Sequence, residues 1–204
     1  MENIILNIID KLVGGNKLFL YLFFFFSQCL QVIFPPYPGD MVLVIEGYLS
    51  ELVNLNIYYI LTIAWFGTFL SSLMLYKLGK KEKILHSKFI KFIFDTKKFL
   101  KIKNMFNKYG VAAIFVSKFI PGIYSFTLLI AGICETNEKL TYLTIGIVNI
   151  IHHTLLIILG KILKENWAII INVIKAYNKY VIIATIIFVL SYVLLIRINK
   201  KKFV

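Results

Sequence analysis

The chain alternates long apolar runs with shorter polar or basic ones. Three apolar runs carry no charged residue, at positions 52–76, 140–160 and 180–196. A helix needs roughly 20 predominantly apolar residues to cross the hydrocarbon core of a bilayer. The pattern therefore predicts three transmembrane helices at these positions.

Two further apolar regions are interrupted in their middle, at 18–50 and 109–134. The first contains the stretch PPYPGD at 35–40, and the second contains Lys118 followed by Pro121 and Gly122. Proline breaks a helix, and the limbs on either side are too short to cross a bilayer alone. We expect two re-entrant hairpins, because irregular backbone at membrane depth is tolerated only inside protein or beside a watery cavity.

Each interrupted region precedes a predicted crossing, which indicates an inverted repeat with a site near the midplane. The expected fold is an all-α integral membrane protein, a multi-pass helical bundle with two re-entrant helical hairpins in an inverted-repeat-like arrangement. Residues 1–204 would form a single membrane domain.

Composition agrees with this interpretation. The chain is 59% hydrophobic and only 16% charged, too little polar surface to cover a water-soluble globule. Its formal net charge is +13, and the basic residues gather between the apolar runs. Anionic lipid headgroups are therefore the expected partner, and nucleic acid is not.

Basic residues also predict the topology. Residues 77–108 carry eleven lysines against Glu82 and Asp95, so this segment should be a cytoplasmic amphipathic helix on the membrane surface. The basic tail at 197–204 should be cytoplasmic as well, which requires that 109–134 return to its side of entry. Residues 161–179 read as an interfacial helix or linker. A topology in which every run crosses fits the charges almost equally well, so the preference rests on Lys118 and Pro121.

Hairpin turns of this kind favour an anionic ligand. The freed amides at Gly39 and Gly122 start half-helices and carry partial positive charge, and Lys118 adds a full one. A phosphate group suits such a site. The alternative for Lys118 is that its ammonium reaches the cytoplasmic interface instead.

Two acids stand out beside the first turn. Asp40 is a candidate proton carrier, and the alternative is that it caps the limb that follows. Glu46 interrupts an apolar limb, where burial disfavours a charged carboxylate, so it is a second candidate proton carrier. Hydration of Glu46 at the outer interface is the alternative.

Other polar residues are weaker candidates. Tyr124 and Ser125 could hydrogen-bond a headgroup or satisfy the broken backbone. Asn149, His152 and His153 fall on nearby positions of one predicted span, as a proton relay or as a hydrogen-bonded packing group.

The sequence resembles the DedA family, also called the VTT or SNARE-associated domain. The resemblance lies in the stretches PPYPGDMVLVIEGYL, WFGTFLSSLMLYKLGK and KYGVAAIFVSKFIPGIYSFTLLIAG, and it covers roughly residues 20–165. It implies a bacterial inner-membrane protein with two facing re-entrant hairpins that flips undecaprenyl phosphate or other lipids, coupled to protons or cations.

The family's charged residues are only partly present. Asp40 matches the acid that closes the family's Pro-x-Pro-Gly-Asp motif, and Lys118 stands at the first arginine before Phe-Ile-Pro-Gly. Tyr124 replaces a second arginine, and Gln28 or Gln31 replaces an upstream acid. The resemblance therefore implies phosphate binding at Lys118 and proton coupling at Asp40, with half of the charged set changed.

We accordingly expect a transporter of a phosphate-bearing lipid in the plasma membrane. Motifs typical of a serine triad, a nucleotide-binding loop or a metal site are missing from the sequence, so we expect neither catalysis nor a cofactor nor a metal. The alternatives are a proton-coupled exporter of small solutes and a non-transporting membrane scaffold. A homo-oligomer is compatible with the sequence.

Overall fold

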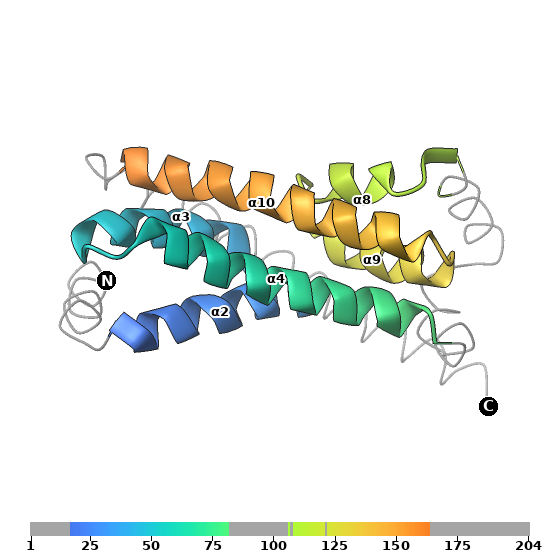
Figure 1. The fold of residues 1–204 in the computed structure, drawn as a ribbon, viewed down its shortest axis with the longest axis horizontal. Coiled ribbons are helices and arrows are strands. Elements are labelled where there is room, and N and C mark those ends of the chain that lie inside the picture. Colours follow the sequence, from blue (N-terminus) through green and yellow to red (C-terminus); the bar gives the residue numbers. More distant parts are fainter. Residues whose placement is uncertain (1–16, 82–105, 107, 121, 164–204) are drawn as a thin grey trace, which may run out of the picture. The chain divides into compact units, whose positions relative to one another are not determined.

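The computed structural model describes residues 17–81, 106, 108–120 and 122–163, and within these the chain is entirely helical. Its helices follow one another as α2 (Lys17–Ile33), α3 (Gly39–Leu52), α4 (Ile57–Gly79), α8 (Ala112–Ser117), α9 (Tyr124–Ile133) and α10 (Glu138–Ile162) (Figure 1). The predicted segments at 82–105 and 164–204, including the third predicted span, lie outside the described residues.

Two helical hairpins occupy the positions where the sequence breaks its apolar runs. The first hairpin consists of α2 and α3 with the turn 34–38, and the second consists of α8 and α9 with the turn 118–123. Phe34 lies outside α2 and precedes Pro35 and Pro36, because proline disfavours helical backbone in the residue before it. A hydrogen bond of 2.7 Å between Ser27 Oγ and the Tyr37 hydroxyl ties the first turn back onto α2.

The two long helices begin at side-chain caps. Asn56 precedes α4 and its side chain accepts a hydrogen bond of 2.9 Å from the Tyr58 amide. Before α10, Asn137 Oδ1 accepts one of 3.0 Å from the Leu140 amide. The prediction that a helix begins at position 52 was wrong, because α3 continues to Leu52 and Asn54 turns the chain with a φ of 51°.

Each hairpin packs on the long helix of the other half of the chain. The second limb α3 packs extensively on α10, and the corresponding limb α9 packs on α4, while α2 also lies along α4. Figure 1 shows α4 and α10 running in opposite directions, with the turns of both hairpins near the middle of these helices.

Glycines allow the backbones to touch where α3 crosses α10. A β-carbon added at Gly47 would lie 2.0 Å from the Ile157 carbonyl oxygen, and one at Gly160 would lie 1.9 Å from that of Val44. No side chain fits at such distances, so small residues set this crossing.

The crossing of α4 and α9 repeats the same arrangement. A β-carbon at Gly79 would meet the Leu129 carbonyl oxygen at 2.2 Å, and one at Gly132 would meet that of Tyr76 at 2.1 Å. In both crossings each glycine faces the carbonyl three residues before the partner glycine. The two halves of the chain thus use corresponding contacts.

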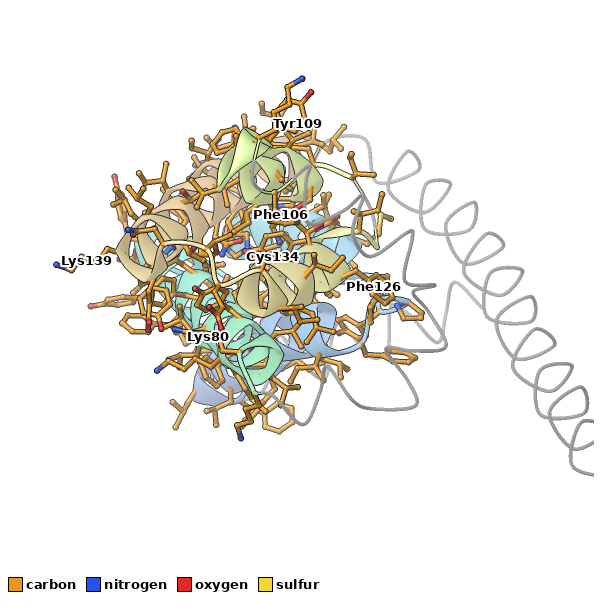
Figure 2. All side chains as sticks on the ribbon, turned by 90° about the vertical axis from the view of Figure 1, so that its right-hand side faces the viewer. Lys80, Phe106, Tyr109, Phe126, Cys134 and Lys139 are labelled. Carbon is orange, nitrogen blue, oxygen red and sulfur yellow. The ribbon has the colours of Figure 1, made fainter. Side chains whose placement is uncertain are left out.

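The distribution of polarity is inverted relative to a soluble protein. Large apolar side chains cover the outside of α2, α4, α8, α9 and α10, including Phe19, Phe26, Leu143 and Ile150, while many polar and ionisable side chains are buried between the helices. Figure 2 shows Phe126 projecting from the outer side of the bundle and Phe106 lying between helices. Exposed apolar surface on this scale indicates contact with a membrane.

Among the described residues, α4 and α10 are long and apolar enough to cross a membrane. The run predicted at 140–160 corresponds to α10 and that predicted at 52–76 corresponds to α4, shifted toward the C-terminus. The limbs α3 and α9, of 14 and 10 residues, are shorter than a crossing requires.

Candidate functional site

The candidate site is a cluster of buried polar side chains around the two hairpin turns. All helices but α8 supply at least one member, and Lys118 comes from the turn that follows α8. Its most deeply buried members are Gln28, Glu46, Thr68, Ser72, Lys118, Tyr124, Asn149, His152 and His153.

Lys118 is the cation of the cluster. It follows α8 directly and is 4% exposed, with its ammonium 4.8 Å from the centroid of the Tyr124 ring. No carboxylate of the described residues forms an ion pair with it. The ammonium therefore does not reach the surface in this structure, and an aromatic face is its nearest counterpart.

Asp40 lies in the first turn of α3 and contacts two other elements. Gln31 Nε2 of α2 donates a hydrogen bond to Asp40 Oδ1, and His152 Nε2 of α10 lies 3.7 Å from the same oxygen. The alternative that Asp40 caps the helix was wrong, because α3 starts one residue earlier and has no side-chain cap. Asp40 instead joins the two halves of the site.

Glu46 also belongs to α3 and is fully buried. Gln28 Nε2 donates a hydrogen bond of 3.0 Å to Glu46 Oε1, and both Glu46 Oε2 and Gln28 Oε1 are buried without a hydrogen-bond partner. Glu46 is therefore not hydrated at the surface in this structure. A carboxylate without a cation partner is costly at such depth, which favours the protonated acid. Gln28 and Gln31, the two candidates for the position of the family's upstream acid, thus each hold one of the two carboxyl groups.

Tyr124 binds neutral partners. Its hydroxyl lies 3.1 Å from Ser72 Oγ of α4 and accepts a hydrogen bond of 3.2 Å from Asn149 Nδ2 of α10. Ser125 Oγ donates one of 2.6 Å to the Val32 carbonyl at the end of α2. Ser125 therefore satisfies the broken backbone of the first hairpin, one of the two roles that the sequence left open.

The two histidines of α10 face different partners. His153 Nε2 lies 3.2 Å from Thr68 Oγ1, whereas His152 faces Asp40. Both Nδ1 atoms are buried without a hydrogen-bond partner. Thr68 and Ser72 were not among the candidates predicted from the sequence. Their spacing of four on the largely apolar helix α4 was the available signal.

The two turn glycines differ in their surroundings, and the ligand role predicted for Gly122 stays a prediction. The amide of Gly39 donates to the Tyr37 carbonyl at 2.9 Å, so amides available for a ligand would have to come from the residues after it. A β-carbon at Gly39 would lie 2.4 Å from Gln31 Cγ, which shows how closely the limbs approach. Gly122 is exposed and has a φ of 77°, a conformation that glycine adopts without strain.

Several known proteins are similar to this chain. An "Alkaline phosphatase-like protein" of Lactococcus lactis subsp. lactis is 26% identical over 211 residues, covering 100% of this chain and 94% of its own length. "Undecaprenyl phosphate transporter A" of Staphylococcus aureus is 27% identical over 209 residues, covering 95% of this chain and 97% of its own. An uncharacterised membrane protein of Bacillus subtilis is 26% identical over 58% of this chain and 75% of its own length. No solved structure gives a significant match.

The VTT domain matches residues 37–162, which is more than half of the chain. This range includes α3, α4, α8, α9 and α10, and it contains Asp40 and Lys118. The similarity to membrane proteins agrees with the apolar outer surface of the helices. This protein therefore belongs to the VTT domain family of membrane proteins, as its resemblance to DedA proteins predicted.

Proposed function

We propose that this protein moves a lipid with a phosphate headgroup, such as undecaprenyl phosphate, across the bacterial inner membrane. The observation that carries the proposal is the buried ammonium of Lys118, which has an aromatic neighbour and no ion-pair partner among the described residues. An unpaired cation at this depth costs stability, and an anionic ligand would compensate it.

The arrangement of helix termini supports the same ligand class. Helices α3 and α9 both begin at the turns beside Lys118, and the first amides of a helix lack partners within it. Such termini favour phosphate groups. The name of the Staphylococcus aureus relative, which refers to undecaprenyl phosphate transport, agrees with this class of substrate.

In the proposed topology the hairpins are re-entrant and form an inverted repeat. The short limbs, the opposite directions of α4 and α10 and the corresponding glycine crossings support it. The headgroup would pass between the hairpin turns while the acyl or prenyl chain stays in lipid. The basic segment 77–108 and the tail would face the cytoplasm.

The proposed driving force is proton uptake and release at Asp40, with Glu46 as a second proton site. Asp40 is connected to both halves of the cluster through Gln31 and His152, so a change in its charge reaches both. Glu46 has one oxygen without a partner, which is where a bound proton or cation would be placed.

A transport assay in proteoliposomes tests the proposal. Vesicles that contain a labelled polyprenyl phosphate and wild type, Asp40→Asn or Lys118→Met would be compared by the fraction of headgroup exposed on the opposite side of the membrane. We expect this fraction to rise with wild type. With both variants it should equal that of vesicles without protein. Lys118→Met should also unfold at a higher temperature than wild type. We expect its free energy of unfolding to be larger by about 1–2 kcal/mol, because a buried charge is removed at similar volume.

Lys80→Gln is the matched control, since Lys80 is an exposed lysine at the end of α4. It should transport like wild type. Wild-type exposure equal to that of empty vesicles would refute the function. Release of inorganic phosphate from the lipid would instead support hydrolysis, the activity that the name of the Lactococcus lactis relative suggests.

A further inference from the structure

His152 is a buried titratable group of the site that the proposed cycle uses only as a contact of Asp40. It is 6% exposed, and its two ring nitrogens differ in their surroundings. Nε2 lies 3.7 Å from Asp40 Oδ1, whereas Nδ1 is buried with no hydrogen-bond partner. A buried nitrogen without a partner points to a ligand atom that binds there.

The groups around His152 come from each element packed on it. Asp40 of α3 and Lys118 of the turn after α8 act on it electrostatically, and His153 is its neighbour on α10 at 6.0 Å between ring centroids. Phe119 places its ring 5.5 Å from the imidazole. From α4 and α9 the polar groups of the same cluster are the Thr68 hydroxyl, which contacts His153, and the Tyr124 phenol, whose ring lies beside Lys118.

The charges of this cluster do not balance a phosphate monoester. Such a headgroup carries about −1.5 to −2 charges near neutral pH, and Lys118 supplies a single positive charge. Tyr124, which lies under the Lys118 ammonium, supplies none. The helix termini of α3 and α9 add only partial charges, so a neutral group that acquires a proton would supply a second full positive charge.

We propose that His152 supplies this charge by taking up a proton from water when the phosphate binds. In the neutral tautomer with hydrogen on Nδ1, the free electron pair of Nε2 faces the Asp40 carboxyl. A proton from water forms the N–H bond at Nε2, which leaves an imidazolium beside Asp40. Nδ1–H then donates a hydrogen bond to a phosphate oxygen, next to Lys118.

This inference rests on the proposed function and gives it a mechanism of coupling. Binding of the anion stabilises the imidazolium, and the imidazolium strengthens binding of the anion, so proton and phosphate are taken up together. When the site opens to the other side, loss of the proton would weaken the phosphate contact and release the headgroup.

Equilibrium binding to the full-length protein in detergent tests the inference without any transport step. The probe is geranyl phosphate, a water-soluble prenyl phosphate, titrated at pH 6 and pH 8. We expect wild type to lose about tenfold more affinity than His152→Gln over this range, as a charge-assisted hydrogen bond is lost. Titration of the ligand itself is the same for both proteins and cancels in the comparison.

Two further variants define the effect. His152→Arg, with a permanent charge, should remove the pH response while binding at pH 8 more tightly than His152→Gln. His153→Gln should keep the wild-type pH response whatever its absolute affinity, because His153 faces Thr68 and not Asp40. Equal pH responses in wild type and His152→Gln would overturn the inference and leave the proposed function intact.

A measurement on the wild type avoids variants that fail to fold. With 15N-labelled histidine, addition of geranyl phosphate should shift one imidazole to the imidazolium form, and His152→Gln identifies which one. A histidine spectrum that stays neutral on binding contradicts the inference, and no binding at any pH contradicts the function as well. Inorganic phosphate is the second ligand, and equal affinity for it would favour the small-solute exporter over the lipid carrier.

Discussion

The two hairpins have the same architecture but opposite chemistry. The first hairpin supplies both acids of the site, Asp40 and Glu46, and holds each with a glutamine. The second hairpin supplies the cation Lys118 and an aromatic ring beneath it. Related packing thus positions an acidic and a basic half of one site, which shows that the glycine crossings fix the geometry while the turn residues set the charge.

The crossing of α3 and α10 is the contact whose loss should have the largest effect. Gly47→Val would place a β-carbon against the Ile157 carbonyl oxygen, with no room for relaxation by a side chain. We expect a loss of about 3 kcal/mol or more, because overpacking separates the helices. Thermal unfolding of the purified protein in detergent measures this.

Gly146→Ala is the matched control for this variant. A β-carbon there would lie 3.7 Å from the Phe69 ring, an ordinary contact. The substitution should leave stability unchanged or raise it by about 0.5–1 kcal/mol, since alanine favours a helix over glycine. Equal losses of stability at both positions would show that close backbone contact at the crossing of α3 and α10 does not determine the effect.

The difference between the hairpins at Tyr124 gives an intermediate effect. Tyr124→Phe keeps the ring beneath Lys118 but removes the hydroxyl that contacts Ser72 and Asn149. Two buried polar groups would lose a partner, so we expect a loss of about 1–2 kcal/mol. Phosphate binding should survive, because the ring and the ammonium remain. Loss of binding with unchanged unfolding temperature would instead assign the hydroxyl to the ligand.

The smallest effect is expected where the ends of α4 and α10 meet. Lys80 Nζ lies 2.9 Å from Glu138 Oε2, and this hydrogen bond raises the pKa of Lys80 above its ordinary value of 10.5. A raised pKa means that the contribution is fully present below the unfolded value and is lost as pH rises through the folded one. The pair is exposed and screened by salt.

Lys80→Gln should therefore leave the unfolding temperature at pH 7 unchanged within error in physiological salt. Wild type and variant should also remain together at a pH above the folded pKa of Lys80, where wild type loses the pair that the variant lacks. A clear destabilisation at pH 7 would indicate that the two halves of the chain depend on this contact and not only on the glycine crossings.

Much of the fold could be predicted from the sequence, for reasons of local chemistry. Prolines at 35, 36, 38 and 121 break the apolar runs where the turns occur, and Asn56 and Asn137 start the long helices. The helix boundary near position 52 could not be predicted, because an apolar residue ends α3 and the turn after it carries no proline or glycine. Asp40, Glu46 and Lys118 stand out in the sequence by their charge in an apolar setting, and their roles in transport stay predictions.

The sequence by itself determined which residues are polar at membrane depth, where the helices break, and that acids and a cation lie near the two breaks. Only the tertiary structure decided which partners they meet: Gln28 with Glu46, Gln31 and His152 with Asp40, and Tyr124 with Lys118. The physical reason is separation along the chain. Turns and caps depend on neighbouring residues. These contacts instead join different helices, and Asp40 and His152 are more than a hundred positions apart. They depend on how closely glycine lets the helix backbones approach.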